Sequence, residues 1–265
     1  TSATIIRVGN PTPSYGNIIV SGSNVSLSSD LASIKMQTGT SFTVTSTGTF
    51  NVQSSTGFTD AAGAAVSSTN NPTIDLQNGS TINYNGIAQP LTPRNDYRNL
   101  TISGSGAKTA ASAFNVAETF TRSGDASLAT TSPTYGAGAT LAYVDATAGR
   151  IYNAGLEWPT ADVPTNLTVN LSGTGTRQVI LPGDRTVAGT ITLSAGELSI
   201  NGNTLTANGA FSYGTGTITG SSTSNLVLNG TAGTVNFTQT SAATRSLSTL
   251  NMGDTSSATL GNALD

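Results

Sequence analysis

The most constraining feature of the sequence is a set of short runs in which apolar and polar residues alternate. Leu167, Val169 and Leu171, for example, are separated by single polar residues. Alternation over a few residues predicts a β-strand with one buried face. Many of the polar positions are Thr, whose β-branched side chain suits an exposed strand face. We therefore expect an all-β protein.

The spacing of these runs predicts how the strands are arranged. The apolar centres after Leu193 are Leu198–Ile200, Leu205, Phe211, Ile218, Leu226–Leu228 and Val235–Phe237. Strands this short and this close together do not suit an immunoglobulin-type sandwich. Three of them make one turn of about 20 residues, which predicts a parallel β-helix, or β-solenoid, whose coils stack about 4.8 Å apart.

Gly and Asn lie between the predicted strands. Three Asn-Gly pairs, at 201–202, 208–209 and 229–230, fall at predicted turns. Both residue types accept a positive φ, so we expect tight turns with left-handed backbone at these pairs.

The composition excludes several kinds of chemistry. Thr (46), Ser (33), Gly (30) and Asn (23) make up half of the 265 residues, and the chain has no His and no Cys. Triads of the Ser-His type and the usual zinc, haem and thiol sites therefore lack their ligands. A net charge of −3 gives no basic surface for nucleic acid. We expect no cofactor, no metal site and no nucleic-acid partner.

Surface chemistry and chain ends indicate a cellular setting. No segment approaches the roughly 20 apolar residues that would span a bilayer. The chain begins with Thr1 instead of Met, which predicts a processed chain or a piece of a longer one. Hydroxyl and amide side chains with little charge are typical of extracellular stalks and fibres. We expect an extracellular or bacterial cell-surface location.

A longer repeat lies over the coils. The paired strand centres are Ile82 with Leu100, Leu141 with Leu167, and Leu226 with Leu250. The separation of the two centres differs from pair to pair, so the repeat is degenerate. We therefore expect N-terminal coils over residues 1–70. Residues 71–265 should hold three degenerate longer repeats, the third of them truncated, within one continuous solenoid.

Two segments carry a family resemblance. Residues 83–109, including Asn83-Tyr84-Asn85-Gly86 and Tyr97-Arg98-Asn99-Leu100-Thr101-Ile102, and residues 189–206 are similar to repeats of large surface proteins of Bacteroidota-type bacteria. Those proteins are secreted by the type IX route and are often adhesin-like. The resemblance covers roughly residues 71–265. It implies a right-handed parallel β-helix, extracellular display and a structural or adhesive role.

One region breaks the rhythm of the coils, from about Tyr135 to Pro164. It contains the only Trp of the chain, and the candidate ligand-binding residues are Trp158, Tyr152, Glu157 and Asp162. Exposed aromatic rings beside carboxylates could stack on a sugar. The second interpretation, which we favour, is a long loop between coils whose Trp covers the core.

Two further functions are weighed against a structural role. Carboxylates about one coil apart, such as Asp162 and Asp184, allow a polysaccharide-cleaving β-helix, but thirteen acidic residues give such spacings by chance. Thr-x-Thr triplets, such as Thr43-Val44-Thr45, allow an ice-binding solenoid, but they do not recur at one coil-length period.

The leading hypothesis is a non-enzymatic structural or adhesive segment of a large surface protein, acting as a stalk, spacer or fibre unit. Its expected partners are other segments or copies of the same chain, joined end to end, and surface glycans. A carbohydrate-binding or carbohydrate-cleaving β-helix is the alternative, and an ice-binding solenoid is a lesser one.

Overall fold

The computed structural model describes residues 4–5, 16–23, 25–26, 34–53, 56–59, 64–67 and 70–265. The chain divides into two compact units, unit 1 (Thr1–Gly136) and unit 2 (Ala137–Asp265). Short parallel strands stack into a β-solenoid of about 11 turns with roughly 21 residues per turn. The all-β parallel solenoid expected from the sequence is confirmed. The rest of the N-terminal coils expected over 1–70 lies outside the described residues.

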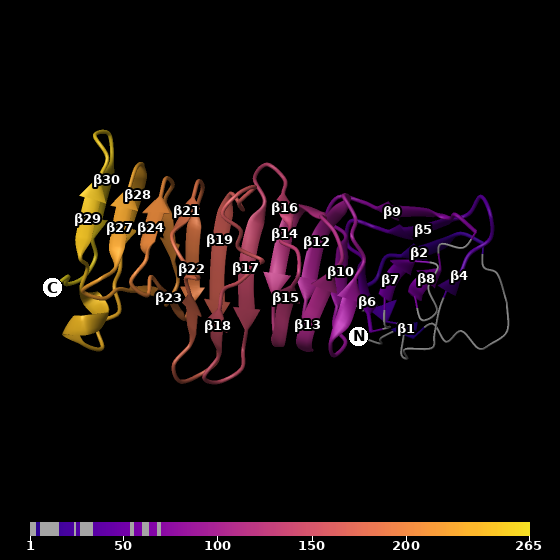
Figure 1. Cartoon of the computed structure of the whole chain (residues 1–265), viewed down its shortest axis with the longest axis horizontal. Coiled ribbons are helices and arrows are strands. Elements are labelled where there is room, and N and C mark those ends of the chain that lie inside the picture. The colour runs from indigo at the N-terminus through magenta and orange to yellow at the C-terminus, as the bar shows by residue number, and fades with distance from the viewer. Residues whose placement is uncertain are drawn as a thin grey trace. The chain divides into compact units, whose positions relative to one another are not determined.

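Unit 1 contains four parallel sheets, and β10, β12 and β14 of the longest one lie side by side (Figure 1). The longest sheet contains β1 (Thr4–Ile5), β3 (Val25–Ser26), β6 (Thr49–Val52), β10 (Thr81–Tyr84), β12 (Tyr97–Ile102) and β14 (Asn115–Arg122), with β16 (Thr134–Tyr135) paired to β14. The other sheets are β2 (Ile18–Val20), β5 (Ser41–Val44) and β9 (Thr73–Leu76); β4 (Ile34–Lys35), β8 (Ala64–Ser67) and β7 (Thr56–Thr59); and β11 (Gln89–Leu91), β13 (Ser105–Ala110) and β15 (Asp125–Ala129).

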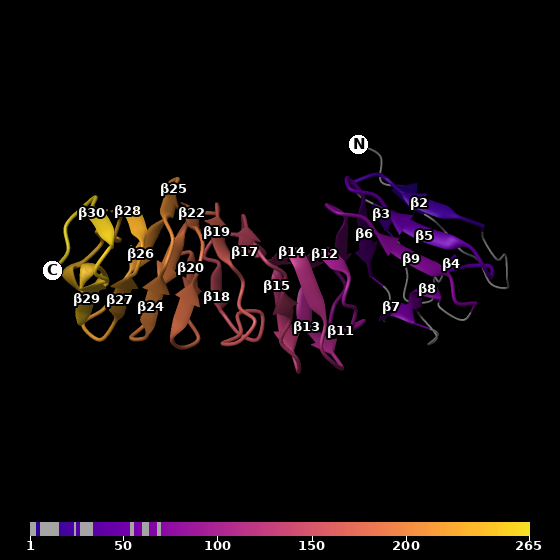
Figure 2. The ribbon, with the colours of Figure 1, turned by 90° about the horizontal axis from the view of Figure 1, so that it is seen from above.

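Unit 2 is more regular, with three faces that each repeat once per coil; Figure 2 shows β24, β27 and β29 of one face in succession. The first face is β17 (Thr140–Asp145), β19 (Asn166–Leu171), β22 (Ile191–Ala195) and β25 (Phe211–Tyr213). The second is β18 (Ile151–Asn153), β20 (Gln178–Ile180), β23 (Glu197–Ser199) and β26 (Thr217–Thr219). The third is β21 (Arg185–Val187), β24 (Thr204–Ala207), β27 (Asn225–Leu228) and β29 (Thr249–Met252). β28 (Thr231–Val235) pairs with β30 (Ser257–Leu260), and the short helix η1 (Ala242–Arg245) precedes β29.

The alternating pattern has the physical meaning that the sequence predicts. In β19, Leu167, Val169 and Leu171 are fully buried, while the residues between them are partly exposed. Inward side chains from successive coils share one narrow core, because a single coil cannot cover its own apolar face. The repeat also has a direct structural basis, since Ile82 lies opposite Leu100 in the parallel pair β10–β12. The other two repeat pairs, Leu141 with Leu167 and Leu226 with Leu250, are cross-strand neighbours in the same way.

The Asn-Gly turns are only partly as expected. Asn201 and Gly202 have φ values of 54° and 76°, which confirms one left-handed turn. The prediction is wrong for Gly209 and Gly230, because neither has a positive φ. Glycine is needed there for space, since a Cβ at Gly209 would meet the carbonyl oxygen of Gly189 in the neighbouring coil. Glycine is therefore required at Gly209 and Gly230 by the close stacking of coils and not by the backbone conformation of a turn.

Outward polar side chains form hydrogen-bonded ladders across coils. Asn51 Nδ2 donates to Ser26 Oγ at 3.0 Å, and Asn83 Nδ2 donates to Asn51 Oδ1 at 2.9 Å. The hydroxyl of Ser103 then donates to Asn83 Oδ1 at 2.8 Å. The ladder therefore joins four successive levels of unit 1 by side-chain bonds, in addition to the backbone bonds of the sheet.

Candidate functional site

The first coil of unit 2 contains the residues singled out by the sequence. Tyr152 lies on β18, and Trp158 and Glu157 lie on the loop that follows it. These three side chains are 2%, 0% and 1% exposed, respectively. The loop turns tightly, since Trp158 N donates to Gly155 O at 3.0 Å. It is also tied to the next coil, because Arg185 Nε on β21 donates to Trp158 O at 2.9 Å.

Glu157 is held by groups of its own coil. Its Oε1 atom accepts the hydroxyl of Tyr143 at 3.1 Å and the backbone N–H of Gly155 at 3.2 Å. Tyr143 comes from β17, so the carboxylate links the first face of the unit to the loop. A buried carboxylate needs such donors, because its desolvation would otherwise be very costly.

Asp145, at the end of β17, makes a second buried network. Its Oδ2 atom accepts the Tyr152 hydroxyl at 2.8 Å and lies 3.0 Å from Nε of Arg150, while Oδ1 accepts Thr147 N at 2.7 Å. Burial alone would raise the pKa of Asp145, but the bonds from Thr147 and Tyr152 and the charge of Arg150 outweigh it and lower the pKa to about 2. This carboxylate is therefore ionised at any ordinary pH.

The two networks stabilise the loop. The rings of Tyr143 and Tyr152 lie 5.5 Å apart between centroids, and each hydroxyl is bonded to one carboxylate. A general acid or base must reach a proton of its substrate, and these carboxylates are 8% (Asp145) and 1% (Glu157) exposed. The two networks hold residues 143–158 against the core.

Of the four predicted ligand-binding residues, the structure brings Tyr152, Trp158 and Glu157 into this buried region. Asp162 lies outside it, exposed on the loop with a φ of 52°. The Trp158 ring presents no face to solvent on which a sugar could stack. Its position is the one expected from the interpretation in which this Trp covers the core.

Sequence reasoning missed a buried cation in unit 1. Lys108 on β13 is 0% exposed, and its Nζ donates to the carbonyl oxygens of Gly86, Ile87 and Ser105 at 2.6, 2.7 and 3.1 Å. Burial lowers the pKa of this ammonium from 10.5 to about 8. The signal was present, because Lys108 is two residues before the small apolar Ala110, at the inward phase of the strand.

A buried tyrosine pair was also missed. The hydroxyls of Tyr84 and Tyr97 lie 2.9 Å apart, and Tyr97 donates to Thr92 O at 2.7 Å. Burial raises the pKa of both hydroxyls, which therefore stay protonated and serve as bonds between β10 and the loop before β12. Alternation placed Tyr84 inward, but Tyr97 is out of phase with Leu100 and Ile102 and is turned inward by an irregularity in the register of β12 and β14.

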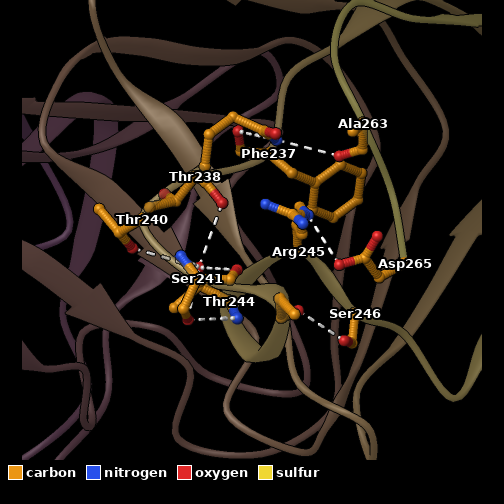
Figure 3. A network of polar contacts seen from close by, with 11 residues as sticks. Phe237, Thr238, Thr240, Ser241, Thr244, Arg245, Ser246, Ala263 and Asp265 are labelled. Carbon is orange, nitrogen blue, oxygen red and sulfur yellow. Dashed lines mark hydrogen bonds and ion pairs between the residues drawn. The ribbon is translucent and has the colours of Figure 1, made fainter.

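The end of unit 2 carries a polar network of a different kind, drawn in Figure 3. Ser241 caps η1 by accepting Thr244 N at 3.3 Å, and Arg245 Nε pairs with Asp265 Oδ2 at 2.8 Å. These residues are exposed or half-buried, in contrast to the networks around Asp145 and Glu157. The network orders the surface around η1 and ties the last residues of the chain to it.

Beside this network, β29 and β30 present an open edge. Each strand is hydrogen-bonded to a neighbouring strand on one side only within the described residues. Leu250, Met252 and Leu260 on these strands are 38%, 40% and 46% exposed. Strand edges with exposed apolar side chains favour pairing with a further strand.

Two kinds of feature are absent from the described residues. They contain no group of three or more His, Cys, Asp and Glu residues arranged to hold a metal ion. None of the helices in that part of the chain has the length and hydropathy needed to cross a membrane.

Comparison of the chain with protein-family models, with curated proteins and with solved structures finds no match. What the chain does must therefore be inferred from its own geometry.

Proposed function

We propose that this chain is a non-enzymatic structural or adhesive segment of a large extracellular or cell-surface protein, in which the solenoid acts as a stalk, spacer or fibre unit. One observation carries the proposal. The buried ionisable side chains Lys108, Asp145 and Glu157 are all bonded to groups of their own unit. Burying a charge is costly, and here Lys108 fastens a strand to a turn of the coil next to it, while Asp145 and Glu157 hold the loop of their own coil.

The open edge supports the part of the proposal that concerns partners. An end-to-end contact would cover Leu250, Met252 and Leu260 and would continue the parallel sheets into the next segment or copy. The outward surface of Thr, Ser and Asn supports a setting outside the cell, where such hydroxyl-rich surfaces are common.

Antibodies against the chain test the location. We expect them to label intact cells that express the parent protein as strongly as lysed cells. Labelling of lysed cells alone would contradict a surface role. Reproducible turnover of a polysaccharide by the purified chain would contradict the non-enzymatic part of the proposal.

Self-association is tested by sedimentation over a wide concentration range. We expect a mass that rises with concentration for the wild type and a monomer for Leu250→Lys. Ile87→Lys is the matched control, because Ile87 is 76% exposed on a turn of unit 1, far along the chain from the open edge. A wild type that stays monomeric at every concentration would overturn the end-to-end contact.

A further inference from the structure

The outward face of β10, β12 and β14 in unit 1 carries a two-dimensional array of Thr and Asn. The array consists of Thr81, Asn83, Asn99, Thr101, Thr119 and Thr121, two residues from each strand. In the register of the sheet, Thr81 lies opposite Asn99, which lies opposite Thr119. The second row runs from Asn83 through Thr101 to Thr121 in the same way.

The spacing of the array follows from strand geometry. Neighbouring strands of a sheet lie about 4.8 Å apart, and residues i and i+2 of one strand are about 6.6 Å apart on the same face. One more coil extends the first row by Thr49 on β6, which lies opposite Thr81, whereas Asn51 opposite Asn83 is buried. The sequence hid this period, because Asn takes the place of Thr at two of the six positions and the coil lengths differ.

The array is half-exposed and its hydroxyls are available. All six side chains are partly accessible to solvent. Four side chains of the array carry a hydroxyl group, and within the described part of the chain none of these hydroxyls makes a hydrogen bond. They belong to Thr81, Thr101, Thr119 and Thr121. This differs from Thr217 and Thr219 in unit 2, whose hydroxyls both bond to Thr238.

The array is also preorganised. The Asn83 amide is fixed at both ends, to Asn51 Oδ1 at 2.9 Å and to the Ser103 hydroxyl at 2.8 Å. Asn99 Nδ2 donates to Gly79 O at 3.1 Å and to Glu118 Oε2 at 3.2 Å. The Thr side chains are stiff because they are β-branched. A ligand would therefore meet groups whose ordering cost is already largely met by the fold.

The chemistry of the array selects one class of ligand. The large aromatic residues of these strands, Tyr84, Tyr97 and Phe120, point inward and are 0% exposed, so no ring is offered to a sugar. None of the six side chains is charged, which argues against phosphate or carboxylate. Regularly spaced hydroxyls and methyl groups suit a ligand that is itself a regular lattice of hydrogen-bonding groups.

We propose that this array is an ice-binding face, on which ordered water molecules bridge the free Thr hydroxyls to the water lattice of an ice surface. First-shell water can bridge polar groups nearly as well as a direct hydrogen bond, at a modest entropic cost. The rigid array lowers that cost further, because it holds its bridging waters at repeating positions. This function goes beyond the structural role proposed above and does not depend on it.

Ice affinity and thermal hysteresis of the purified full chain test the proposal. We expect the wild type to be taken up into a slowly growing ice hemisphere and to depress the freezing point below the melting point. Thr101→Tyr, at the centre of the array, should abolish both effects, because its ring lifts an ice plane off the neighbouring rows. Thr81→Tyr should do the same independently.

The matched control is Thr109→Tyr on β13. Thr109 is equally half-exposed on a central strand of unit 1, but its cross-strand neighbours are Pro90 and Ala129. This variant should bind ice like the wild type, and far-UV circular dichroism should show all three variants folded.

Exclusion of the wild type from ice would overturn the proposal directly. Equal ice uptake by the wild type, Thr101→Tyr and Thr81→Tyr would overturn the assignment to this face. Should a Tyr variant fail to fold, Thr101→Val provides the readout, because it keeps the shape and removes the hydroxyl. Unchanged hysteresis in Thr101→Val together with Thr121→Val would contradict a role for these hydroxyls.

Discussion

In unit 1, Phe50 lies opposite Ile82, and the coil that joins them contains four strands, β6 to β9. In unit 2, Ile191 lies opposite Phe211, and the shorter coil that joins them contains three strands, β22 to β24. In the longer coil β7 pairs with β8, so the additional residues add a strand to the sheet β4–β8–β7, while β6 and β10 still pair directly.

The cores of the two coils also differ. In unit 1, Phe42, Phe50 and Phe58 form a cluster with ring centroids 5.0 to 6.3 Å apart. In the short coil of unit 2, Leu193, Leu198 and Leu205 are fully buried, and no aromatic side chain is needed between them. Interiors pack to a constant density, so the space between the strands of the longer coil must be filled by large side chains. Coil length alone does not set the residue type, because the short coil from Ile82 to Leu100 buries Tyr84 and Tyr97.

The largest expected effect probes the phenylalanine cluster of the longer coil. Phe50→Ala should lower the free energy of unfolding by about 4 kcal/mol, because it leaves a cavity between the rings of Phe42 and Phe58. Leu193→Ala in the short coil should cost about 3 kcal/mol. Urea denaturation measures both. A smaller loss for Phe50→Ala than for Leu193→Ala would break the comparison.

The buried charges give each unit its own pH dependence. In unit 1, the pKa of Lys108 is about 8 in the folded chain and 10.5 when unfolded. Between these values the unfolded state binds more protons, so Lys108 alone should raise the free energy of unfolding by about 2 kcal/mol, while the buried Tyr84 and Tyr97, whose pKa values are raised, act in the opposite direction near pH 10. Lys108→Met should remove this rise, while Lys35→Met, an exposed control on β4, should keep it. Equal pH slopes for the wild type and Lys108→Met would contradict the assignment.

In unit 2 the free energy of unfolding should depend on pH in the acidic range. The pKa of Asp145 falls from 3.8 to about 2 on folding, so its contribution is complete above pH 4. We expect a loss of about 1 to 2 kcal/mol of unfolding free energy as the pH drops from 4 to 2. Asp145→Asn should flatten this part of the profile, and Asp254→Asn, at an exposed position, should not. Thermal or urea unfolding across that range decides between the two outcomes.

The smallest expected effect concerns the ladders. Asn83→Ala removes two side-chain bonds inside a half-buried ladder and should cost about 1 kcal/mol. Asn229 donates to Asn208 Oδ1 at 3.1 Å in an exposed ladder of unit 2, and Asn229→Ala should cost less than half as much. Equal losses for the two variants would show that burial does not set the value of a ladder bond.

The sequence predicted the solenoid because each strand carries its own signal. Leu167, Val169 and Leu171 fix the inward face of β19, and matching the runs around Ile82 and Leu100 found true cross-strand neighbours. These are local patterns, and stacking repeats them from coil to coil.

What the sequence could not give depends on contacts between coils. Two of the three carbonyls around Lys108, those of Gly86 and Ile87, belong to a turn of the neighbouring coil, and only the register brings them to its side chain. The loop that carries Trp158 is tied down in the same way by Arg185 of the next coil, which bonds to the Trp158 carbonyl. The Thr and Asn array was hidden for a related reason, since its rows cross coils of unequal length.

The central claim is that the long coil from Phe50 to Ile82 in unit 1 and the short coil from Ile191 to Phe211 in unit 2 stack with the same rise. Because the chain has no Cys, nitroxide labels can be placed in pairs at Thr49 and Thr81 in unit 1, and at Thr192 and Ser212 in unit 2. Each pair lies on directly opposed positions of neighbouring strands. Electron paramagnetic resonance should show strong and equal dipolar broadening for both pairs, as expected for backbones about 4.8 Å apart. Weak or absent broadening for the Thr49 and Thr81 pair would contradict the account.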